Sequence, residues 1–161
     1  IKEINLNIAK KIGFMQGRLS NLVDGLIQAF PWDTWTNEFS EANSIKMNLM
    51  EWTLDFEGIY SNPLMSEEGR KKINSLSNKF DICIPSLTAD CFMQKPFWKF
   101  DGTDALKLQN IFVDVLMAAS KLGIKYIIVP LVDNGRIENS FQEETVKNFL
   151  LENVNLLEEG S

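Results

Sequence analysis

Polar side chains able to bind a polyol lie at the ends of four short apolar runs along the chain. They are Gln16 and Arg18, then Glu51, Asp90 and Asp133. Carboxylates and amides exchange hydrogen bonds with vicinal hydroxyls, and a guanidinium can hold a phosphate or carboxylate through two parallel bonds. These residue types therefore indicate a substrate-binding set for a polyol.

Each of these residues also has a structural interpretation. Arg18 could pair only with a neighbouring acid, and Asp90 could cap a loop. Asp133 opens an Asp-Asn-Gly sequence, a strong turn signature, so turn formation and ligand binding are equally open for it. Glu51 favours a pocket over a structural role, because it lies between two apolar residues at the end of its run.

Other reactive groups offer little chemistry. The chain has no histidine, which is the residue most used as a neutral-pH base and transition-metal ligand. Cys91 is a poor nucleophile without a histidine to activate it, and Cys83, which alternates with two isoleucines, is predicted to lie in the core. The aromatic residues of segment 92–100 could form a lid over a ligand or simply pack a long loop.

Composition limits the class of protein. With 161 residues, 45% of them hydrophobic and 24% charged, the chain is expected to form one domain over residues 1–161. The net charge of −6 argues against nucleic acid and acidic membranes as partners, because such binders carry a basic surface. The longest apolar run, 126–132, is too short for a membrane helix of about 20 residues. Two cysteines and no recognisable secretory leader favour a cytoplasmic protein.

Four strands are expected to alternate with four helices. The strands are predicted from short apolar runs at residues 11–16, 46–52, 81–87 and 125–131. The helices are predicted from apolar residues at helical spacing and from capping signals, over residues 33–44, 66–80, 104–122 and 141–158. This order, without a linker, predicts an α/β fold with a parallel sheet joined by right-handed crossovers.

The segments that follow the predicted strands are long, whereas those that lead from a helix to the next strand are short. The long segments all lie at the carboxyl edge of the sheet. In α/β proteins that edge binds ligands, because it collects loops and helix N-termini. The candidate polyol-binding side chains belong to this same edge.

Six segments resemble bacterial sugar phosphate isomerase/epimerases of the xylose isomerase-like barrel superfamily. They are 12–19 (IGFMQGRL), 28–31 (QAFP), 50–52 (MEW), 62–64 (NPL), 86–93 (SLTADCFM) and 130–134 (PLVDN). The resemblance runs through nearly the whole chain, and the segments fall in the family's order at the predicted strand ends. Our fold prediction is therefore the (βα)₄ half of a TIM (β/α)₈ barrel, with parallel strands and outer helices.

The resemblance implies a metal-assisted isomerase or epimerase. In the family a divalent metal of the Mn or Mg class, held on the later strands, assists proton transfer next to a carbonyl through an enediolate. By carry-over, Gln16, Arg18, Glu51, Asp90 and Asp133 would line the pocket for a sugar or sugar phosphate. No catalytic residue and no metal ligand is expected within this chain, so by itself it is predicted to be inactive.

As the N-terminal half of a barrel the chain is expected to be truncated, and two copies could pair through the open sheet edges to form a homodimer. It could also be a pseudoenzyme subunit that completes its site with another chain. Alternatively it is a non-catalytic α/β module that binds a small molecule or a partner. That module would have a doubly wound sheet with helices on both faces, whereas the barrel reading places all helices on the outer side.

Overall fold

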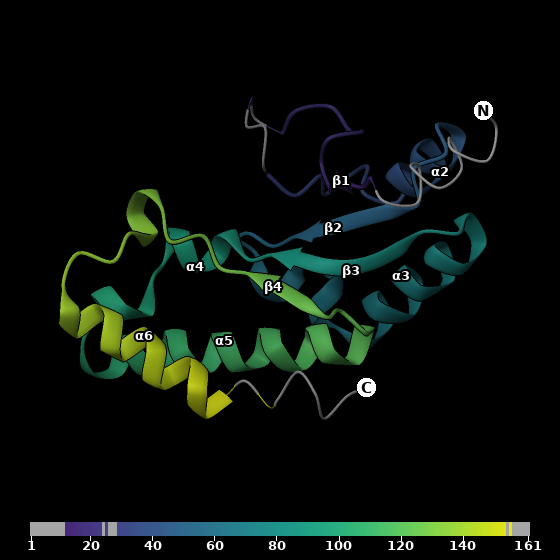
Figure 1. Ribbon diagram of the computed structural model, residues 1–161. Helices are drawn as coiled ribbons and strands as arrows, with labels where there is room; N and C mark the ends of the chain where they lie inside the picture. Colours follow the sequence, from purple (N-terminus) through teal and green to yellow (C-terminus); the bar gives the residue numbers. More distant parts are fainter. Residues whose placement is uncertain (1–11, 24, 26–28, 154, 156–161) are drawn as a thin grey trace.

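The structure is a computed structural model that describes residues 12–23, 25, 29–153 and 155. Its centre is a parallel sheet with strand order β1-β2-β3-β4 (Figure 1). The strands are β1 (Phe14–Met15), β2 (Leu49–Thr53), β3 (Cys83–Thr88) and β4 (Tyr126–Ile128). Each strand pairs in parallel with the next along the chain. The predicted α/β class and parallel sheet are therefore confirmed.

The strands are shorter than predicted. Residue 11 of the first predicted strand lies outside the described residues. Residue 28, the first of the segment 28–31 (QAFP), does so too. The second strand begins later than expected because Lys46 has a left-handed backbone, with φ of 63°, which ends the preceding turn. The fourth stops at Ile128, two residues before Pro130, which has no N–H to donate to a ladder.

Helices follow the strands at the four predicted places. They are α2 (Asn37–Ser44), α3 (Glu67–Phe80), α5 (Gly102–Leu122) and α6 (Ser140–Asn153), to which the structure adds a short helix α4 (Asp90–Gln94). Four 3₁₀ turns complete the described elements: η1 (Ile59–Ser61), η2 (Pro63–Met65), η3 (Phe97–Lys99) and η4 (Asp133–Gly135). Most of the predicted helix beyond residue 153 lies outside the described residues.

The helix ends follow local capping chemistry. The Ser66 hydroxyl accepts a hydrogen bond from the Gly69 N–H at 3.0 Å, and α5 ends at Gly123 with φ of 82°, as the sequence predicts. At α6, which begins at Ser140, the capping residue is Asn139, whose Oδ1 accepts from the Gln142 N–H at 3.0 Å.

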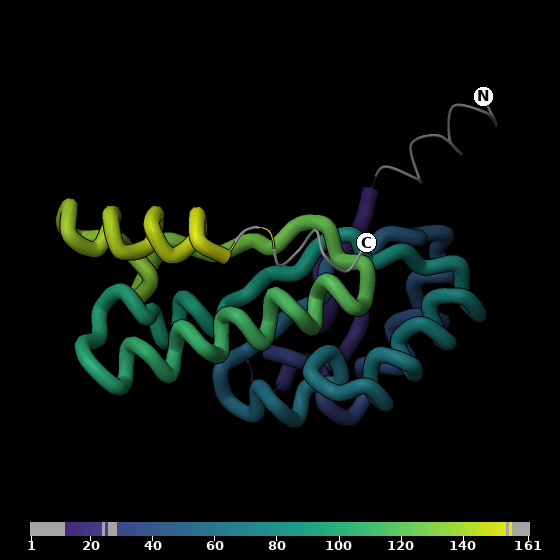
Figure 2. Tube along the Cα trace, turned by 90° about the horizontal axis from the view of Figure 1, so that it is seen from below, coloured from purple at the N-terminus to yellow at the C-terminus, as the bar shows by residue number. Residues whose placement is uncertain are grey.

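The two faces of the sheet differ sharply. Met50, Trp52 and Leu87 point to one face, where they are buried in a core shared with α2, α3 and α5. We call it the covered face, and Figures 1 and 2 show α3 and α5 lying along it. The opposite face, which we call the open face, is exposed or half-buried. Its residues are Leu49, Glu51, Ser86, Tyr126 and Ile128.

Cys83 corrects one prediction. The sequence placed its thiol in the core, but the structure exposes it. Ile82 and Ile84 occupy the inward positions, and Cys83 lies opposite Leu49 of β2, on the open side. The prediction was wrong because it assumed that a parallel strand is covered on both faces.

The aromatic residues after β3 form the second half of the core. Phe92 stacks on Phe112 with ring centroids 4.2 Å apart, and Phe97 lies 4.7 Å from Phe149 of α6. Packing, rather than a lid, therefore accounts for the buried rings of this segment. Within the described part of the chain, no helix is long and apolar enough to cross a membrane.

Candidate functional site

The carboxyl ends of β1, β2 and β3 are joined by a network of polar contacts. The Gln16 N–H donates to the Glu51 carbonyl at 2.9 Å, which extends the ladder between β1 and β2. The Gln16 side-chain Oε1 accepts from the Thr53 N–H at 3.3 Å, and the Thr53 hydroxyl donates to the Gln16 carbonyl at 3.3 Å. Gln16 is fully buried, and its Nε2 has no hydrogen-bond partner among the described residues.

Glu51 connects β2 to β3 through its side chain. Its carboxylate accepts from the Ser86 hydroxyl at 2.8 Å and also from the Thr88 hydroxyl. These two neutral donors fix the carboxylate in place, while each hydroxyl oxygen keeps acceptor capacity for a ligand. Glu51 and Ser86 also line a hollow of about 300 Å³ over β1, β2 and β3.

Asp90 lies at the start of α4, directly beyond β3, and only 4% of it is exposed. Burial raises the pKa of its carboxyl, and the negative charges of Asp55 and Glu51 raise that pKa further. The positive charge of Arg18 acts in the opposite direction. A carboxyl that holds its proton more tightly than usual is suited to hydrogen-bond donation and to acid–base work.

Asp55 belongs to this site, although the sequence did not single it out. Its Oδ2 accepts from the Phe30 N–H at 2.9 Å, and its Oδ1 accepts from Gln94 Nε2 at 2.8 Å. Asp55 therefore ties the β2 loop to the β1 loop and to α4. A sequence signal did exist, because Thr-x-Asp occurs after both β2 and β3 and its threonines, Thr53 and Thr88, are register partners.

Glu38 of α2 is the second residue that sequence reasoning missed. It is fully buried, and its carboxylate accepts from the Gly17 N–H at 2.9 Å and from the Leu19 N–H at 3.0 Å. These bonds flank Arg18 and hold its backbone. Burial raises the pKa of Glu38, against the lowering effect of the two backbone donors. The signal was its position on the same helical face as Phe39 and Ala42.

Arg18 is exposed at the rim of this site. Its Nη2 lies 3.6 Å from the Met15 sulfur, and its charge lowers the pKa of both Asp90 and Glu38. The structure thus places a guanidinium beside a group of carboxyls, at an edge that solvent reaches. Such a position is suited to a phosphate or carboxylate on a ligand.

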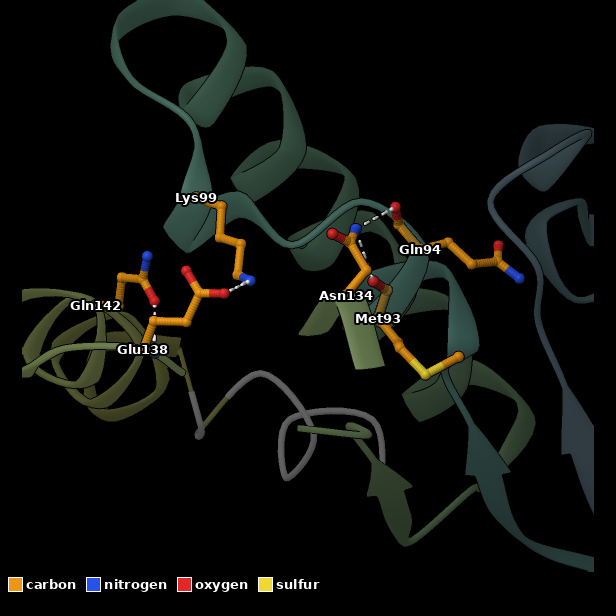
Figure 3. A network of polar contacts seen from close by, with 6 residues as sticks. All are labelled: Met93, Gln94, Lys99, Asn134, Glu138 and Gln142. Atoms are coloured by element: carbon orange, nitrogen blue, oxygen red, sulfur yellow. Dashed lines mark hydrogen bonds and ion pairs between the residues drawn. The ribbon is translucent and has the colours of Figure 1, made fainter. Parts of the chain in front are cut away.

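Asp133 is the predicted site residue that the structure does not join to the others. It is exposed, it has a left-handed φ of 49°, and it opens the η4 turn. The neighbouring Asn134 donates from Nδ2 to the carbonyls of Met93 and Gln94, at 3.3 and 3.1 Å, where α4 ends (Figure 3). The turn interpretation therefore accounts for both residues.

The other end of this loop is held by an ion pair. Lys99 Nζ lies 2.8 Å from Glu138 Oε1, and the Glu138 N–H donates to Gln142 Oε1 at 2.8 Å (Figure 3). The lysine lowers the pKa of the exposed Glu138 carboxyl by hydrogen bonding and by its charge. These contacts attach η3 to the start of α6, and none of them reaches the network at the strand ends.

Two further groups limit the chemistry. Cys91 is fully buried, and burial raises the pKa of its thiol, so the reactive thiolate form is suppressed. Among the described residues, no group of three or more histidine, cysteine, aspartate or glutamate side chains could hold a metal ion. What the described strand ends offer is a hollow lined in part by Glu51 and Ser86, with the buried Gln16 amide, the buried Asp90 carboxyl and the exposed Arg18 guanidinium at the neighbouring strand ends.

Comparison with known proteins adds no assignment. No family model matches the chain, and no curated protein matches it.

Proposed function

We propose that this chain is the N-terminal (βα)₄ half of a sugar isomerase or epimerase barrel of the xylose isomerase-like kind. Consecutive parallel strands with helices along one face are what half of a (βα)₈ barrel consists of. A doubly wound sheet would instead have helices on both faces and a reversal in strand order. The observed order β1-β2-β3-β4 has no such reversal.

The observation that carries the proposal is the convergence of Gln16, Glu51 and Asp90 at one end of three neighbouring strands. In α/β barrels that end holds the active site. In our proposal Gln16 and Glu51 bind sugar hydroxyls, and Asp90, whose pKa is raised by burial, forms a hydrogen bond with a sugar oxygen. Arg18 receives a phosphate or carboxylate at the rim. Asp133 remains a predicted pocket residue only if a ligand reaches the η4 turn.

The divalent metal implied by the resemblance does not fit the residues described here, because they offer no group of three ligands. In the proposal the Mn or Mg class ion and the proton-transferring carboxylates come from the other half of the barrel. This chain supplies the substrate-facing strand ends and is inactive alone.

The experiment is proton exchange at the carbon next to the carbonyl of ketoses and ketose phosphates, measured by NMR in D₂O with Mn²⁺ or Mg²⁺. It compares this chain with the longest natural polypeptide that contains it. We expect exchange by the longer polypeptide and none by this chain. Exchange by neither, over a panel that includes phosphorylated and free ketoses, would refute the assignment to this reaction class.

A second candidate is a non-catalytic module that binds a small polar ligand or a partner. It is favoured by the fact that the carboxylates are already held by internal donors, since Asp55 is bonded by the Phe30 N–H and by Gln94. A prearranged polar wall binds ligands without chemistry. Ligand-induced shifts in the NMR signals of Gln16 and Thr53, without proton exchange by any form of the protein, would support this candidate.

A further inference from the structure

A second hollow lies on the helical side of the molecule, where η1, η2, α3 and α5 meet. It measures about 260 Å³, and Figure 2 shows α3 beside α5. Its lining includes four polar side chains, those of Tyr60, Arg70, Asp114 and Lys121. No residue lines both this hollow and the one over β1, β2 and β3. The hollow between the helices is therefore distinct from the proposed sugar pocket.

One wall of this hollow is fixed by contacts between α3 and η2. Arg70 donates from Nη1 to the Leu64 carbonyl at 2.8 Å, which ties its guanidinium to η2. Glycine at position 69 permits this packing, because a Cβ at Gly69 would lie 2.0 Å from the Pro63 carbonyl oxygen. Arg70 donates no other hydrogen bond within the described residues, so its remaining N–H groups are available to a ligand. A guanidinium that is already oriented binds at a lower entropic cost.

Charges of both signs line the hollow. Asp114 and Lys121 lie on one face of α5, and Arg70 belongs to α3. The ion pairs formed within the described residues join neither cation to Asp114. Tyr60 Oη instead donates to Asp114 Oδ2 at 2.7 Å. Partial burial and the hydrogen bond to Asp114 raise the pKa of Tyr60 to about 12, so the phenol stays a donor at neutral pH.

The two cations are close enough to act on one carboxylate. Lys71 Nζ lies 2.6 Å from Glu67 Oε1 and lowers the pKa of this exposed carboxyl most. The charges of Arg70 and Lys121 lower the pKa of Glu67 further, so both lie within electrostatic range of the same group. Because Glu67 is already paired with Lys71, a carboxylate brought by a ligand would be a further partner for Arg70 and Lys121.

We propose that this hollow binds an acidic α-amino acid of the size of glutamate. The ligand carboxylates lie against Arg70 and Lys121, and its ammonium group lies against the Asp114 carboxylate. Met65 and Met117, which also line the hollow, contact the carbon chain. Two negative groups and one positive group on the ligand complement the two cations and the carboxylate of the hollow.

Simpler ions match the hollow less well. An anion without a positive group would meet the Asp114 carboxylate, and the like charges would oppose its binding. A cation without a carboxylate would be repelled by Arg70 and Lys121 in the same way. The acidic amino acid is the ligand class for which every charged group of the hollow gains an opposite charge.

Isothermal titration calorimetry at pH 7 with L-glutamate tests this proposal. Glutarate is the matched control ligand, because it has the same carbon chain and both carboxylates but no ammonium group. We expect saturable binding of glutamate and at least about tenfold weaker binding of glutarate, a difference typical of one lost ionic contact. Equal affinity for the two ligands would overturn the proposal, as would the absence of glutamate binding.

Two variants of the chain locate the binding. Lys121→Gln should weaken glutamate binding at least about tenfold. Lys147→Gln is its control, since Lys147 is an exposed residue of α6 and its replacement removes the same charge. It should leave the affinity unchanged, and equal losses in both variants would reduce the effect to non-specific attraction. Asp114→Asn should abolish the preference for glutamate over glutarate.

An NMR titration of the unaltered protein keeps the test independent of how the variants fold. We expect L-glutamate to shift the signals of the Met117 methyl group and the Ala118 amide, both at the hollow. Shifts confined to other parts of the chain would refute this location. The proton-exchange experiment concerns the strand ends, so this proposal and the proposed function can each fail alone.

Discussion

The covered and open faces of the sheet are built from the same four strands but with opposite chemistry. The covered face carries large buried side chains such as Trp52, whose ring lies 5.7 Å from both Phe30 and Trp35. The open face carries a carboxylate, a hydroxyl and exposed aromatic and aliphatic groups, among them Glu51 and Tyr126. Stability is therefore expected to depend on the first face, and association and ligand binding on the second.

The two faces also differ in the role of their glutamate carboxylates, Glu38 and Glu51. Both Glu38 and Glu51 are held by hydrogen bonds from neutral groups, but the donors of Glu38 include two backbone N–H groups of the β1 loop. The carboxylate on the covered side thus fixes a loop that carries Arg18, whereas the carboxylate on the open side faces a hollow. The same residue type has a structural role on one face and a candidate binding role on the other.

The largest expected difference between the two sides is in thiol reactivity. Cys83 is exposed and Cys91 is buried, so a disulfide-exchange reagent should label one thiol rapidly in the native protein. We expect Cys91 to react at least about a hundredfold more slowly, because labelling requires an opening reaction that costs several kcal/mol. Time-resolved mass spectrometry with peptide mapping measures both rates. Slow labelling of Cys83 at high protein concentration, relieved by dilution, would reveal that the open face is covered by self-association.

Truncation of one aromatic side chain on each face tests the stability half of the comparison. Trp52→Ala should destabilise the protein by about 3–5 kcal/mol, because it empties a buried site and leaves Asn62 without the indole N–H that it accepts at 3.1 Å. Tyr126→Ala should change the free energy of unfolding by no more than about 0.5 kcal/mol. Urea unfolding followed by circular dichroism gives both values, and comparable losses would contradict the distinction between faces.

The two carboxylates provide a finer test. Glu38→Ala leaves buried donors on Gly17 and Leu19 without an acceptor, so we expect a loss of roughly 1–3 kcal/mol. Glu51→Ala should cost less, since the half-buried Ser86 hydroxyl lines the hollow and can rotate toward water. Glu41→Ala on the exposed side of α2 serves as the baseline. A larger loss for Glu51→Ala than for Glu38→Ala in urea unfolding would invert the assignment of roles.

The parts of this fold that could be predicted are those set by local pattern. Short apolar runs and capping residues predicted the sheet and the four main helices, and the strand ends predicted that Gln16, Glu51 and Asp90 converge. Their role as ligand contacts stays a prediction. The exposure of Cys83 was not predicted, because the alternation of side chains along β3 does not show whether the second face of the sheet is covered.

The contacts that could not be predicted are those between distant segments. Glu38 bonds to Gly17, 21 positions away, and Asp55 bonds to Gln94, 39 positions away. A buried carboxylate needs hydrogen-bond donors, so its burial cannot be predicted from local sequence when those donors lie far away along the chain. Asp133 does not join the other candidate residues for the same reason. The turn that contains it is fixed by hydrogen bonds from Asn134 to the distant helix α4.

The smallest expected effect is the pH dependence contributed by Asp90. Its pKa is raised in the folded protein, so the folded state binds the proton more tightly than the unfolded state does. The stabilising contribution of the protonated form is therefore present at low pH and is lost as pH rises through the folded pKa. Asp90→Asn removes this component, so its free energy of unfolding should decline less than that of wild type as pH rises above about 4. Parallel pH profiles for the two proteins, measured by urea unfolding, would show that Asp90 ionises as freely in the folded protein as in the unfolded chain. That outcome would remove the physical basis for giving Asp90 a proton-holding role beside Glu51 and Asp55.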